Sequence, residues 1–558
     1  MRVLDFFCGA GGFSEGFRQA GFEIIWAIDK WQPAVDTHAE NHPGCVTVRM
    51  DIVALSLLPD VAFHSIVPDA EIIIGSPPCT FFSNSNRSGS GNKSQGKKLI
   101  EAFLRIVARK KFRKNSPLRY WILENVPNAR VHIKRSYSAH SLGLSGAFDL
   151  KVKGVNAGEY NAKYYGVPSN RTRYFCGDFI TPRSNITADV ELIPLGTILD
   201  ALGSPKERLH ATIVDPLYGF TMPGEDVTDH HYVQELAEFE QITIRRLKQD
   251  KGYMGRMAVR ENSDKPARTI MATMSFSSRE CFVLGHGAAS LRAPTIREVA
   301  SLMSFPIDYR FYGGSLGVKY KLVGNAVPPK MSFAFASAIN AHEQMHAPAR
   351  YVHIVHPNNT YFKNLNLDEV PVKEERHKRQ KTRFRYHIPE FKFDTYRVEL
   401  TNYHSDFLNE QFKWDAEIHY NQGKNKARIF IPDPDGICVD SHDICEIDSF
   451  VESIRKNLVG FDQFQAVYCM TLGEQRLSVS VGPYELLSRI KGFISESFKS
   501  DFDNFAPLVD EPFCLPKPIA LGYIALSRCL AVMTSKGSPD HHQLPFNSVH
   551  IDTLEMAI

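Results

Sequence analysis

A glycine-rich turn between an apolar segment and a helical segment, at the start of the chain, constrains the fold more than any other feature. Residues 2–7 (Arg-Val-Leu-Asp-Phe-Phe) are mostly apolar, residues 8–12 read Cys-Gly-Ala-Gly-Gly, and residues 13–20 have helical periodicity. Glycines let the backbone approach a ligand closely, and the amino end of the next helix favours an anionic group. The order strand, glycine turn, helix therefore predicts an α/β fold that binds a nucleotide-type cofactor.

Acidic residues end the next two predicted strands. The apolar run 23–28 ends at Asp29, and the run 46–50 ends at Asp51, which Ile52 follows. Asp29 is placed to accept hydrogen bonds from ribose hydroxyls, or alternatively to cap the following helix. Asp51 could meet the amino group of an adenine. The sequence has no GxxxxGK[ST] motif, which argues against ATP-type phosphate binding.

A cysteine follows the fourth predicted strand, in the stretch 75–83 (Gly-Ser-Pro-Pro-Cys-Thr-Phe-Phe-Ser). The apolar run 71–74 reads as a buried strand, and two prolines stop it just before Cys79. Ligands of open α/β sheets bind at the carboxyl ends of the strands, so Cys79 is a candidate nucleophile. The alternative is a buried cysteine that only contributes to packing.

A carboxylate follows the fifth predicted strand, which covers residues 119–123 and ends in Glu124-Asn125-Val126-Pro127. If the fourth and fifth strands are neighbours, Cys79 and Glu124 share one crevice. A carboxyl buried there has a raised pKa and can donate a proton. The Ser-, Gly-, Asn- and Lys-rich stretch 84–98 predicts a mobile loop that closes over a substrate, or else a plain surface loop.

Six motifs, in order from residue 1 to about residue 345, resemble the cytosine-5 DNA methyltransferase family. They are Asp5–Phe13, Pro77–Cys79, Glu124–Val126, Gly166–Arg173, Thr295–Pro306 and Lys321–Pro329. The chain departs from the usual pattern at four places: Thr80 and Ser169 stand where Gln is usual, Asp29 where Glu is commoner, and 95–98 lack the usual Arg-Gly pair.

The resemblance implies a fold and a chemistry. The fold would be a Rossmann-like methyltransferase sheet, and the methyl donor S-adenosylmethionine. The Cys79 thiolate would add to carbon 6 of cytosine, which makes carbon 5 nucleophilic. Glu124 would hold ring nitrogen 3 and the exocyclic amine, while Arg171 and Arg173 would hold the carbonyl oxygen. The family flips the target base out of the duplex. The positions that match its cofactor contacts are Phe7, Gly9, Ala10, Gly11, Gly12, Asp29, Asp51, Ile52, Pro78, Leu99, Asn325 and Ala326.

The length of 558 residues predicts several domains. We expect a catalytic domain over 1–180 and 291–345, a short target-recognition region over 181–290, a basic linker over 346–390 and an α+β domain over 391–558. In the recognition region, 233–251 reads as a helix and 267–284 as β structure. Residues 252–256 and 277–279 would contact DNA or form solvated loops.

The C-terminal part has several possible roles. The basic run 376–385 would neutralise phosphates or act as a solvated linker. The runs 391–400 and 427–432 alternate like strands, and 450–458 and 484–498 read as helices. The domain would add DNA recognition, or act as a metal-dependent nuclease through Asp415, Glu417 and Lys426.

Composition limits the remaining choices. The net charge is only +3, so a nucleic-acid surface must be local, and the ten cysteines form no CxxC pair, which argues against a zinc ribbon or a disulfide framework. No signal peptide and no membrane span are apparent. Together with the family resemblance, these features lead us to expect a cytoplasmic, monomeric DNA cytosine-5 methyltransferase of the bacterial or phage restriction–modification kind that acts on double-stranded DNA. The alternatives are a tRNA methyltransferase of the same family and a DNA-binding module that only retains the fold.

Overall fold

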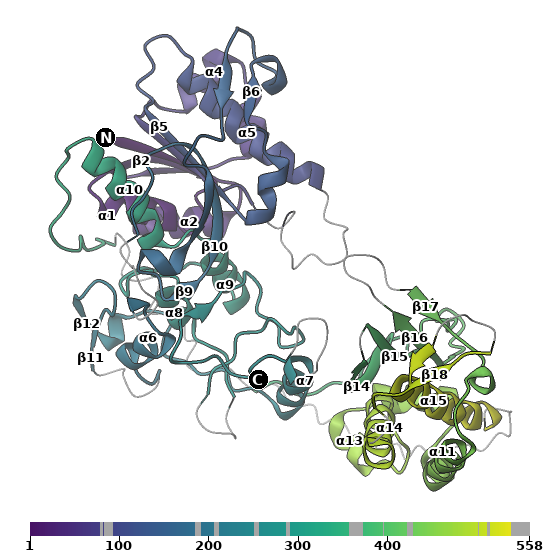
Figure 1. The fold of residues 1–558 in the computed structure, drawn as a ribbon. Helices are drawn as coiled ribbons and strands as arrows, with labels where there is room; N and C mark the ends of the chain where they lie inside the picture. Colours follow the sequence, from purple (N-terminus) through teal and green to yellow (C-terminus); the bar gives the residue numbers. More distant parts are fainter. Residues whose placement is uncertain are drawn as a thin grey trace, which may run out of the picture. The chain divides into compact units, whose positions relative to one another are not determined.

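The chain forms two compact units, each described here by itself (Figure 1). Unit 1 comprises Met1–Leu247 and Ala258–Lys373, and unit 2 comprises Lys248–Met257 and Glu374–Ile558. The computed structural model describes residues 1–78, 82, 93–184, 191–205, 211–249, 256–285, 291–356, 372–393, 395–420, 428–499, 502–509 and 514–536.

A seven-stranded sheet forms the centre of unit 1, in the order β3-β2-β1-β4-β5-β10-β8. The first five strands run parallel, and β10 is antiparallel to both of its neighbours. This arrangement confirms the Rossmann-like α/β fold expected from the sequence. The strands are β1 (Arg2–Phe6), β2 (Glu23–Asp29), β3 (Val46–Arg49), β4 (Ile72–Gly75), β5 (Tyr120–Asn125), β8 (Gly158–Asn161) and β10 (Thr172–Asp178).

Helices cover both faces of this sheet (Figure 1). Successive strand residues point to opposite faces, so Val3 packs in one apolar cluster while Leu4 packs in the other. Burial on both faces explains why the central strands β1, β4 and β5 are continuous apolar runs instead of alternating patterns. The cluster that contains Leu4 includes residues of α3 (Ile52–Ser56), α4 (Asp60–Ile66) and α5 (Lys93–Lys111). The cluster that contains Val3 includes residues of α1 (Gly12–Gln19) and α10 (Pro329–His342). Helix α2 (Gln32–Asn41) links β2 to β3.

The rest of unit 1 contains short elements around a third apolar cluster. The helix expected over 233–251 is present as α7, but the β structure expected over 267–284 is present only at its two ends. Ala267 and Arg268 pair with Ser169 and Asn170, and Leu284 forms an isolated antiparallel bridge with Arg292. The residues between them include turns in which Ser275 and Ser278 accept hydrogen bonds from nearby amides. The elements are β6 (Ser136–Ser138), β7 (Asp149–Lys151), β9 (Ser169–Asn170), α6 (Leu195–Leu202), β11 (Thr212–Val214), β12 (Thr221–Pro223), α7 (Glu238–Gln249), β13 (Ala267–Arg268), α8 (Ile296–Leu302) and α9 (Leu316–Asn325).

Unit 2 is an α+β arrangement with its own core. Its antiparallel sheet, β14-β15-β16-β17, packs one face against helices α14 and α15. Strand β14 begins at Arg385, so the end of the stretch 346–390, which was expected to be a linker, is part of the folded unit. Ile388 and Phe391 of this strand pack into the core. The strands are β14 (Arg385–Phe393), β15 (Tyr396–Thr401), β16 (Asp415–Tyr420), β17 (Arg428–Phe430), β18 (Phe505–Pro507) and β19 (Cys514–Pro516); the helices are α11 (Ser441–Ile454), α12 (Phe461–Cys469), α13 (Leu472–Leu477), α14 (Pro483–Ser497) and α15 (Lys517–Ser535).

One helix among the described residues, α15, is long and apolar enough to cross a membrane by length and composition. About two thirds of its apolar window is buried inside unit 2, where Leu521 and Ile524 have no exposed surface. The core helix of a globular unit has the same composition, and α15 occupies that position here.

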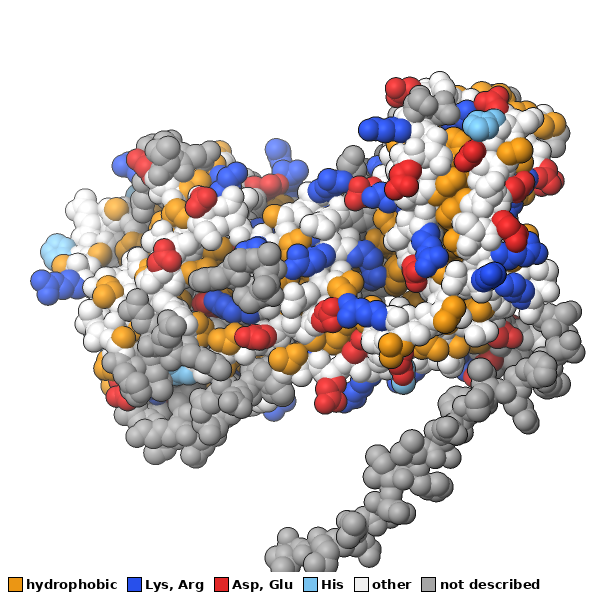
Figure 2. Space-filling view, turned by 90° about the horizontal axis from the view of Figure 1, so that it is seen from below, with side chains coloured by type: hydrophobic (Ala, Val, Ile, Leu, Met, Phe, Trp, Pro, Cys, Tyr) orange, Lys and Arg blue, Asp and Glu red, His pale blue; other side chains and the backbone are white. Residues whose placement is uncertain are grey.

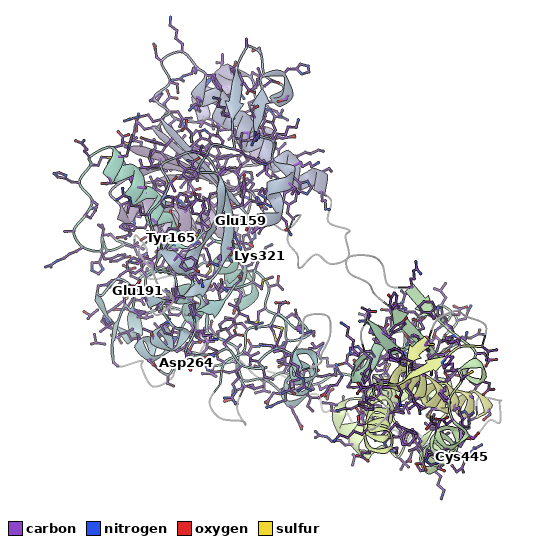
Figure 3. All side chains as sticks on the ribbon, in the orientation of Figure 1. Glu159, Tyr165, Glu191, Asp264, Lys321 and Cys445 are labelled. Carbon is purple, nitrogen blue, oxygen red and sulfur yellow. The ribbon has the colours of Figure 1, made fainter. Side chains whose placement is uncertain are left out.

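Charged side chains of both signs are interspersed on the face drawn in Figure 2. The described cysteines are all free thiols, including the exposed Cys445 on α11, which Figure 3 labels. Both observations agree with the low net charge and with the expectation that cysteine pairs do not organise the fold.

Candidate active site

The carboxyl ends of β4 and β5 lie next to each other. These strands are parallel neighbours, with Gly75 opposite Leu123, and Asn125 donates a hydrogen bond of 2.9 Å to the carbonyl of Pro77. The backbone is therefore fixed two residues before Cys79. Cys79 itself, Thr80 and residues 84–92 of the loop expected over 84–98 lie outside the described residues.

Glu124 is buried at the end of β5, with 6% of its surface exposed. Its Oε1 lies 3.2 Å from Nε of Arg173, which extends from the neighbouring strand β10. Burial raises the pKa of Glu124, while the charges of Arg173 and Arg171 oppose that shift. A carboxyl with a raised pKa is more readily protonated near neutral pH and can therefore act as a hydrogen-bond or proton donor.

The two arginines have different surroundings. Arg173 faces Glu124, and its Nη1 donates to the carbonyl of Thr172 at 2.8 Å. Arg171 is 1% exposed and donates to three backbone carbonyls, those of Ile270 (3.0 Å), Gly324 (2.9 Å) and Ala326 (3.1 Å). Both guanidinium groups were expected to hold the substrate carbonyl. Arg171 thereby ties the β9–β10 corner to the end of α9, which indicates a positioning role, and its expected contact with the substrate carbonyl stays a prediction.

The glycine turn adopts the left-handed backbone conformation at Phe7 (φ 59°), Gly9 (φ 52°) and Gly11 (φ 85°). Among the described residues, the atom nearest to a Cβ atom on Gly9 would be the carbonyl oxygen of Phe7, at 4.0 Å, so the turn is open there. A Cβ atom on Gly11 would lie 2.5 Å from the hydroxyl of Tyr309. Gly9 therefore leaves room for a ligand, whereas Gly11 is required by packing.

Asp29 holds the turn from the end of β2. Its Oδ2 accepts from the amide of Gly9 at 3.0 Å and its Oδ1 from the amide of Trp31 at 2.9 Å, which leaves each oxygen a further lone pair. Burial raises the pKa of Asp29, and these amide bonds oppose the shift. An acceptor pair of this kind, beside an open glycine turn, fits the ribose of a nucleoside cofactor.

Asp51 serves as the cap of α3. Its Oδ1 accepts from the amides of Val53 (2.8 Å) and Ala54 (3.3 Å), and Oδ2 forms an ion pair of 2.7 Å with Lys30. The hydrogen bond from Lys30 lowers the pKa of Asp51. Asp51 thus has a structural role as well as its expected place beside the cofactor.

The other expected cofactor positions differ in their exposure. Ile52 is buried, Leu99 is half-buried on α5, and Pro78 and Asn325 are exposed. Ala10 and Ala326 belong to one apolar cluster, and the carbonyl of Val327 leaves no space for a Cβ atom on Gly12. The last sequence motif therefore returns to the first glycine turn. Helix α9, which leads into it, carries Lys321, labelled in Figure 3.

Sequence reasoning missed the polar groups beneath the turn. The hydroxyl of Tyr309 donates to the carbonyl of Ala10 at 2.5 Å, and Ser14 donates to Asp5 at 2.7 Å. His38 lies 3.1 Å from Ser14, and burial raises the pKa of Asp5 to about 8. Tyr309 follows the late helix motif by only three residues, which was the signal available in the sequence.

The predicted DNA contacts of the recognition region are only partly described. Residues 252–255 lie outside the described residues, and Arg256 forms an ion pair of 2.8 Å with Glu390 inside unit 2. Ser169, where the family usually has Gln, is buried, and its hydroxyl approaches the carbonyl of Arg268 at 3.4 Å. It therefore joins β9 to the recognition region.

A model of the C-5 cytosine-specific DNA methylase family matches residues 1–341. The type II methyltransferase M.HgiDI of Herpetosiphon aurantiacus is 28% identical over 349 residues, which cover 61% of this chain and 95% of that protein. M1.HphI of Haemophilus parahaemolyticus is 28% identical (61% and 86% covered), and M.MthTI of Methanothermobacter thermautotrophicus is 27% identical (61% and 97% covered). The family match ends at residue 341 and so leaves out the C-terminal unit. Because it spans more than half of the 558 residues, the chain belongs to the C-5 cytosine-specific DNA methylase family and is a DNA cytosine methyltransferase.

Proposed function

We propose that the chain transfers a methyl group from S-adenosylmethionine to carbon 5 of a cytosine in a specific duplex DNA sequence. One observation carries this proposal: the buried Glu124 contacts Arg173, and its neighbour Asn125 bonds the backbone that leads to Cys79. An acid and a cation lie at the edge of the sheet where ligands of such folds bind, which supports the proposed position of the Cys79 thiol at the same edge.

Cys79 is the proposed nucleophile. Its thiolate adds to carbon 6 of the cytosine, and the displaced electron pair makes carbon 5 nucleophilic enough to take the methyl group. Loss of the proton from carbon 5 then returns an electron pair to the ring, and the bond between carbon 6 and sulfur breaks. The thiolate is regenerated, as covalent catalysis requires.

Glu124 and Arg173 stabilise the charge that develops during this addition. Protonated Glu124 donates to ring nitrogen 3 as the adduct forms, and its raised pKa favours that state. Arg173 contacts both Glu124 and the carbonyl oxygen of the base. The two groups can reach a cytosine only after it leaves the base stack, so base flipping is part of the proposal.

The cofactor supplies a methyl group bonded to a sulfonium. The glycine turn Gly9 to Gly12, which is open at Gly9, would hold its amino-acid portion, Asp29 its ribose and Asp51 with Ile52 its adenine. These residues lie at the ends of β1, β2 and β3, which are adjacent strands. Pro78, Leu99, Asn325 and Ala326 would complete the contacts.

A duplex that contains 5-fluorocytosine at the target position tests the mechanism. Fluorine cannot leave as a cation, so the wild-type protein should form a covalent adduct in the presence of S-adenosylmethionine. Cys79→Ser should form none, whereas Cys438→Ser, at an exposed cysteine, should react normally. An adduct on any other residue would contradict the proposal.

The type II names of the relatives favour a modification enzyme of a restriction–modification system, which we propose to be cytoplasmic and monomeric. Methylation-sensitive sequencing of DNA from cells that express the chain would give the recognition sequence. Labelled methyl transfer to tRNA in preference to duplex DNA would favour the alternative, a tRNA methyltransferase.

A further inference from the structure

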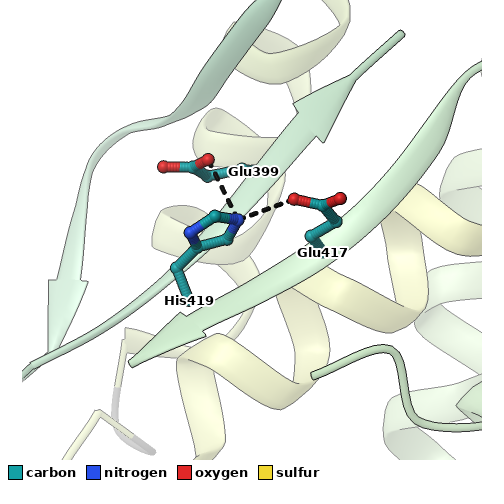
Figure 4. Close-up of side chains that lie close together, drawn as sticks. All are labelled: Glu399, Glu417 and His419. Atoms are coloured by element: carbon teal, nitrogen blue, oxygen red, sulfur yellow. Dashed lines mark hydrogen bonds and ion pairs between the residues drawn. The ribbon is translucent and has the colours of Figure 1, made fainter. Parts of the chain in front are cut away.

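Unit 2 has a polar sheet face opposite its core. On β15 and β16, Val398, Leu400 and Ile418 pack against the helices, so the alternating residues point to the other face. Glu399, Glu417 and His419 are among those residues (Figure 4). Nothing in the methyl-transfer chemistry of unit 1 uses this face.

Strand register brings these three side chains together. Glu399 lies directly opposite Glu417 in the antiparallel pair, and His419 is two residues further along β16, on the same face. All three are buried, with 3%, 1% and 4% of their surface exposed. Their oxygen and nitrogen ligand atoms lie within 4.8 Å of one another.

One imidazole nitrogen faces two carboxylates. Nε2 of His419 lies 2.7 Å from Oε2 of Glu417 and 3.1 Å from Oε2 of Glu399. A ring nitrogen carries at most one hydrogen, so at most one of these contacts is a linear hydrogen bond. Within the described part of the chain, this oxygen of Glu399 accepts no hydrogen bond. Ligands that share one ion at about 2.0–2.2 Å lie roughly 3 Å apart, which is the spacing seen here.

Two arginines approach the same carboxylates from the solvent side. Arg397 lies 2.5 Å from Oε1 of Glu399, and Arg385 lies 3.3 Å from Oε2 of Glu417 and 3.6 Å from Oε2 of Glu399. They are 21% and 33% exposed, whereas the carboxylates are almost completely buried. The arginines offset the negative charge, so an ion-pair network is the alternative that an experiment must exclude. The arginines do not change the count at Nε2 of His419, which still has at most one hydrogen for the two carboxylates.

A second layer of polar groups supports Glu417. Nδ1 of His404 lies 2.9 Å from Asp415, and its Nε2 lies 3.9 Å from Oε1 of Glu417. Groups of this kind orient the ligands of metal sites. Of the three residues considered for a nuclease, Asp415 and Glu417 are on this strand, while Lys426 lies outside the described residues.

We propose that Glu399, Glu417 and His419 bind a divalent first-row transition-metal ion on the polar face of unit 2. Two carboxylates and an imidazole suit Mn²⁺ or Zn²⁺ better than Ca²⁺, which prefers ligand sets of oxygen alone. Three protein ligands leave coordination positions open to water or to an anionic group.

Titration calorimetry of the chelator-treated full-length protein with Mn²⁺ and with Zn²⁺ tests the site. We expect one ion per chain, and at least a tenfold loss of affinity in Glu399→Gln and Glu417→Gln. Glu452→Gln changes a carboxylate that is 70% exposed on α11 and outside this face, so it should bind like wild type. Circular dichroism spectra identify any variant that fails to fold.

Pulsed electron paramagnetic resonance of the wild-type Mn²⁺ complex tests the ligand set independently of how the glutamate variants fold. Coupling to ¹⁴N of a coordinated imidazole is expected, and it should disappear in His419→Gln. Three results would overturn the proposal: absence of binding of both ions by the wild-type chain, affinities in the two glutamate variants equal to that of Glu452→Gln, or a Mn²⁺ spectrum without nitrogen coupling.

Discussion

Replacement of Arg171 by Met tests whether this arginine positions the active site. Methionine keeps an apolar stem of similar length but removes the hydrogen bonds to Ile270, Gly324 and Ala326. Three bonds from a charged donor, at ~1.5 kcal/mol each, contribute roughly 4–5 kcal/mol. Removal of a buried cation recovers part of its desolvation cost, so we expect a net loss of about 3 kcal/mol.

Hydrogen exchange measured by mass spectrometry is the appropriate assay, because two compact units need not unfold in one transition. Peptides from β1, β4 and β5 report the opening of unit 1 alone. A loss of about 3 kcal/mol makes exchange through this opening roughly a hundredfold faster. Arg130→Met is the matched control: Arg130 is 58% exposed and forms one ion pair of 3.3 Å with Glu159, so its change should stay within about 0.5 kcal/mol.

The same variant should separate cofactor binding from DNA binding. The carbonyls of Gly324 and Ala326 flank Asn325, a proposed cofactor contact, so Arg171→Met should raise the KM for S-adenosylmethionine while DNA affinity is kept. If the β5 peptides of Arg171→Met exchange no faster than those of Arg130→Met, the three hydrogen bonds do not stabilise unit 1 and the positioning role is wrong.

Three further substitutions have defined outcomes. Cys79→Ser should abolish methyl transfer but keep DNA binding, and substantial transfer of labelled methyl groups by this variant would contradict the mechanism. Glu124→Gln should slow single turnover by about 10²–10⁴-fold. Because the protonated form of Glu124 is the active one and its pKa is raised, wild-type kcat/KM should fall as pH rises through the pKa of Glu124. The pH profile of Glu124→Gln should not show this fall. Gly11→Ala should destabilise unit 1, because φ is 85° at this position and the new Cβ atom would lie 2.5 Å from the Tyr309 hydroxyl. In the control Gly143→Ala, φ is 65° and no described atom lies within 4 Å of the new Cβ atom, so backbone strain alone costs about 1–2 kcal/mol. The thermal shift of Gly11→Ala should be the larger, and equal shifts would refute the packing role.

Stability should also depend on pH through Glu124. Its pKa is raised in the folded state, so the folded protein binds the proton more tightly than the unfolded chain. The contribution of this proton to the free energy of unfolding is present at low pH and is lost as pH rises through the folded pKa. Glu124→Gln should remove this part of the pH dependence, which chemical denaturation at several pH values would measure.

Local sequence patterns predicted most of the unit 1 sheet. The apolar runs that became β1, β4 and β5 are continuous because both faces of these strands are buried, and a continuous run is readable without knowledge of its neighbours. The glycine turn and Glu124 lie at the ends of such runs, so their places needed no tertiary information. Segments whose environment is one-sided or irregular were harder to predict. The β structure expected over 267–284 is present only as the pairing of Ala267–Arg268 and the isolated bridge at Leu284, and helix α15 and strand β16 were not predicted as elements.

Only the tertiary structure decided what the charged side chains contact. Arg171 and Arg173 have the same residue type and adjacent places in one motif, yet one bonds carbonyls 99, 153 and 155 residues away and the other faces Glu124. Glu399 and Glu417 became neighbours through strand register. The sequence alone determined the strands and the order of the motifs, since these depend on local periodicity and residue type, and the resemblance of the motifs to the family indicated the reaction class. The partners of buried charges depend on contacts between distant segments, and such contacts exist only once the chain has folded.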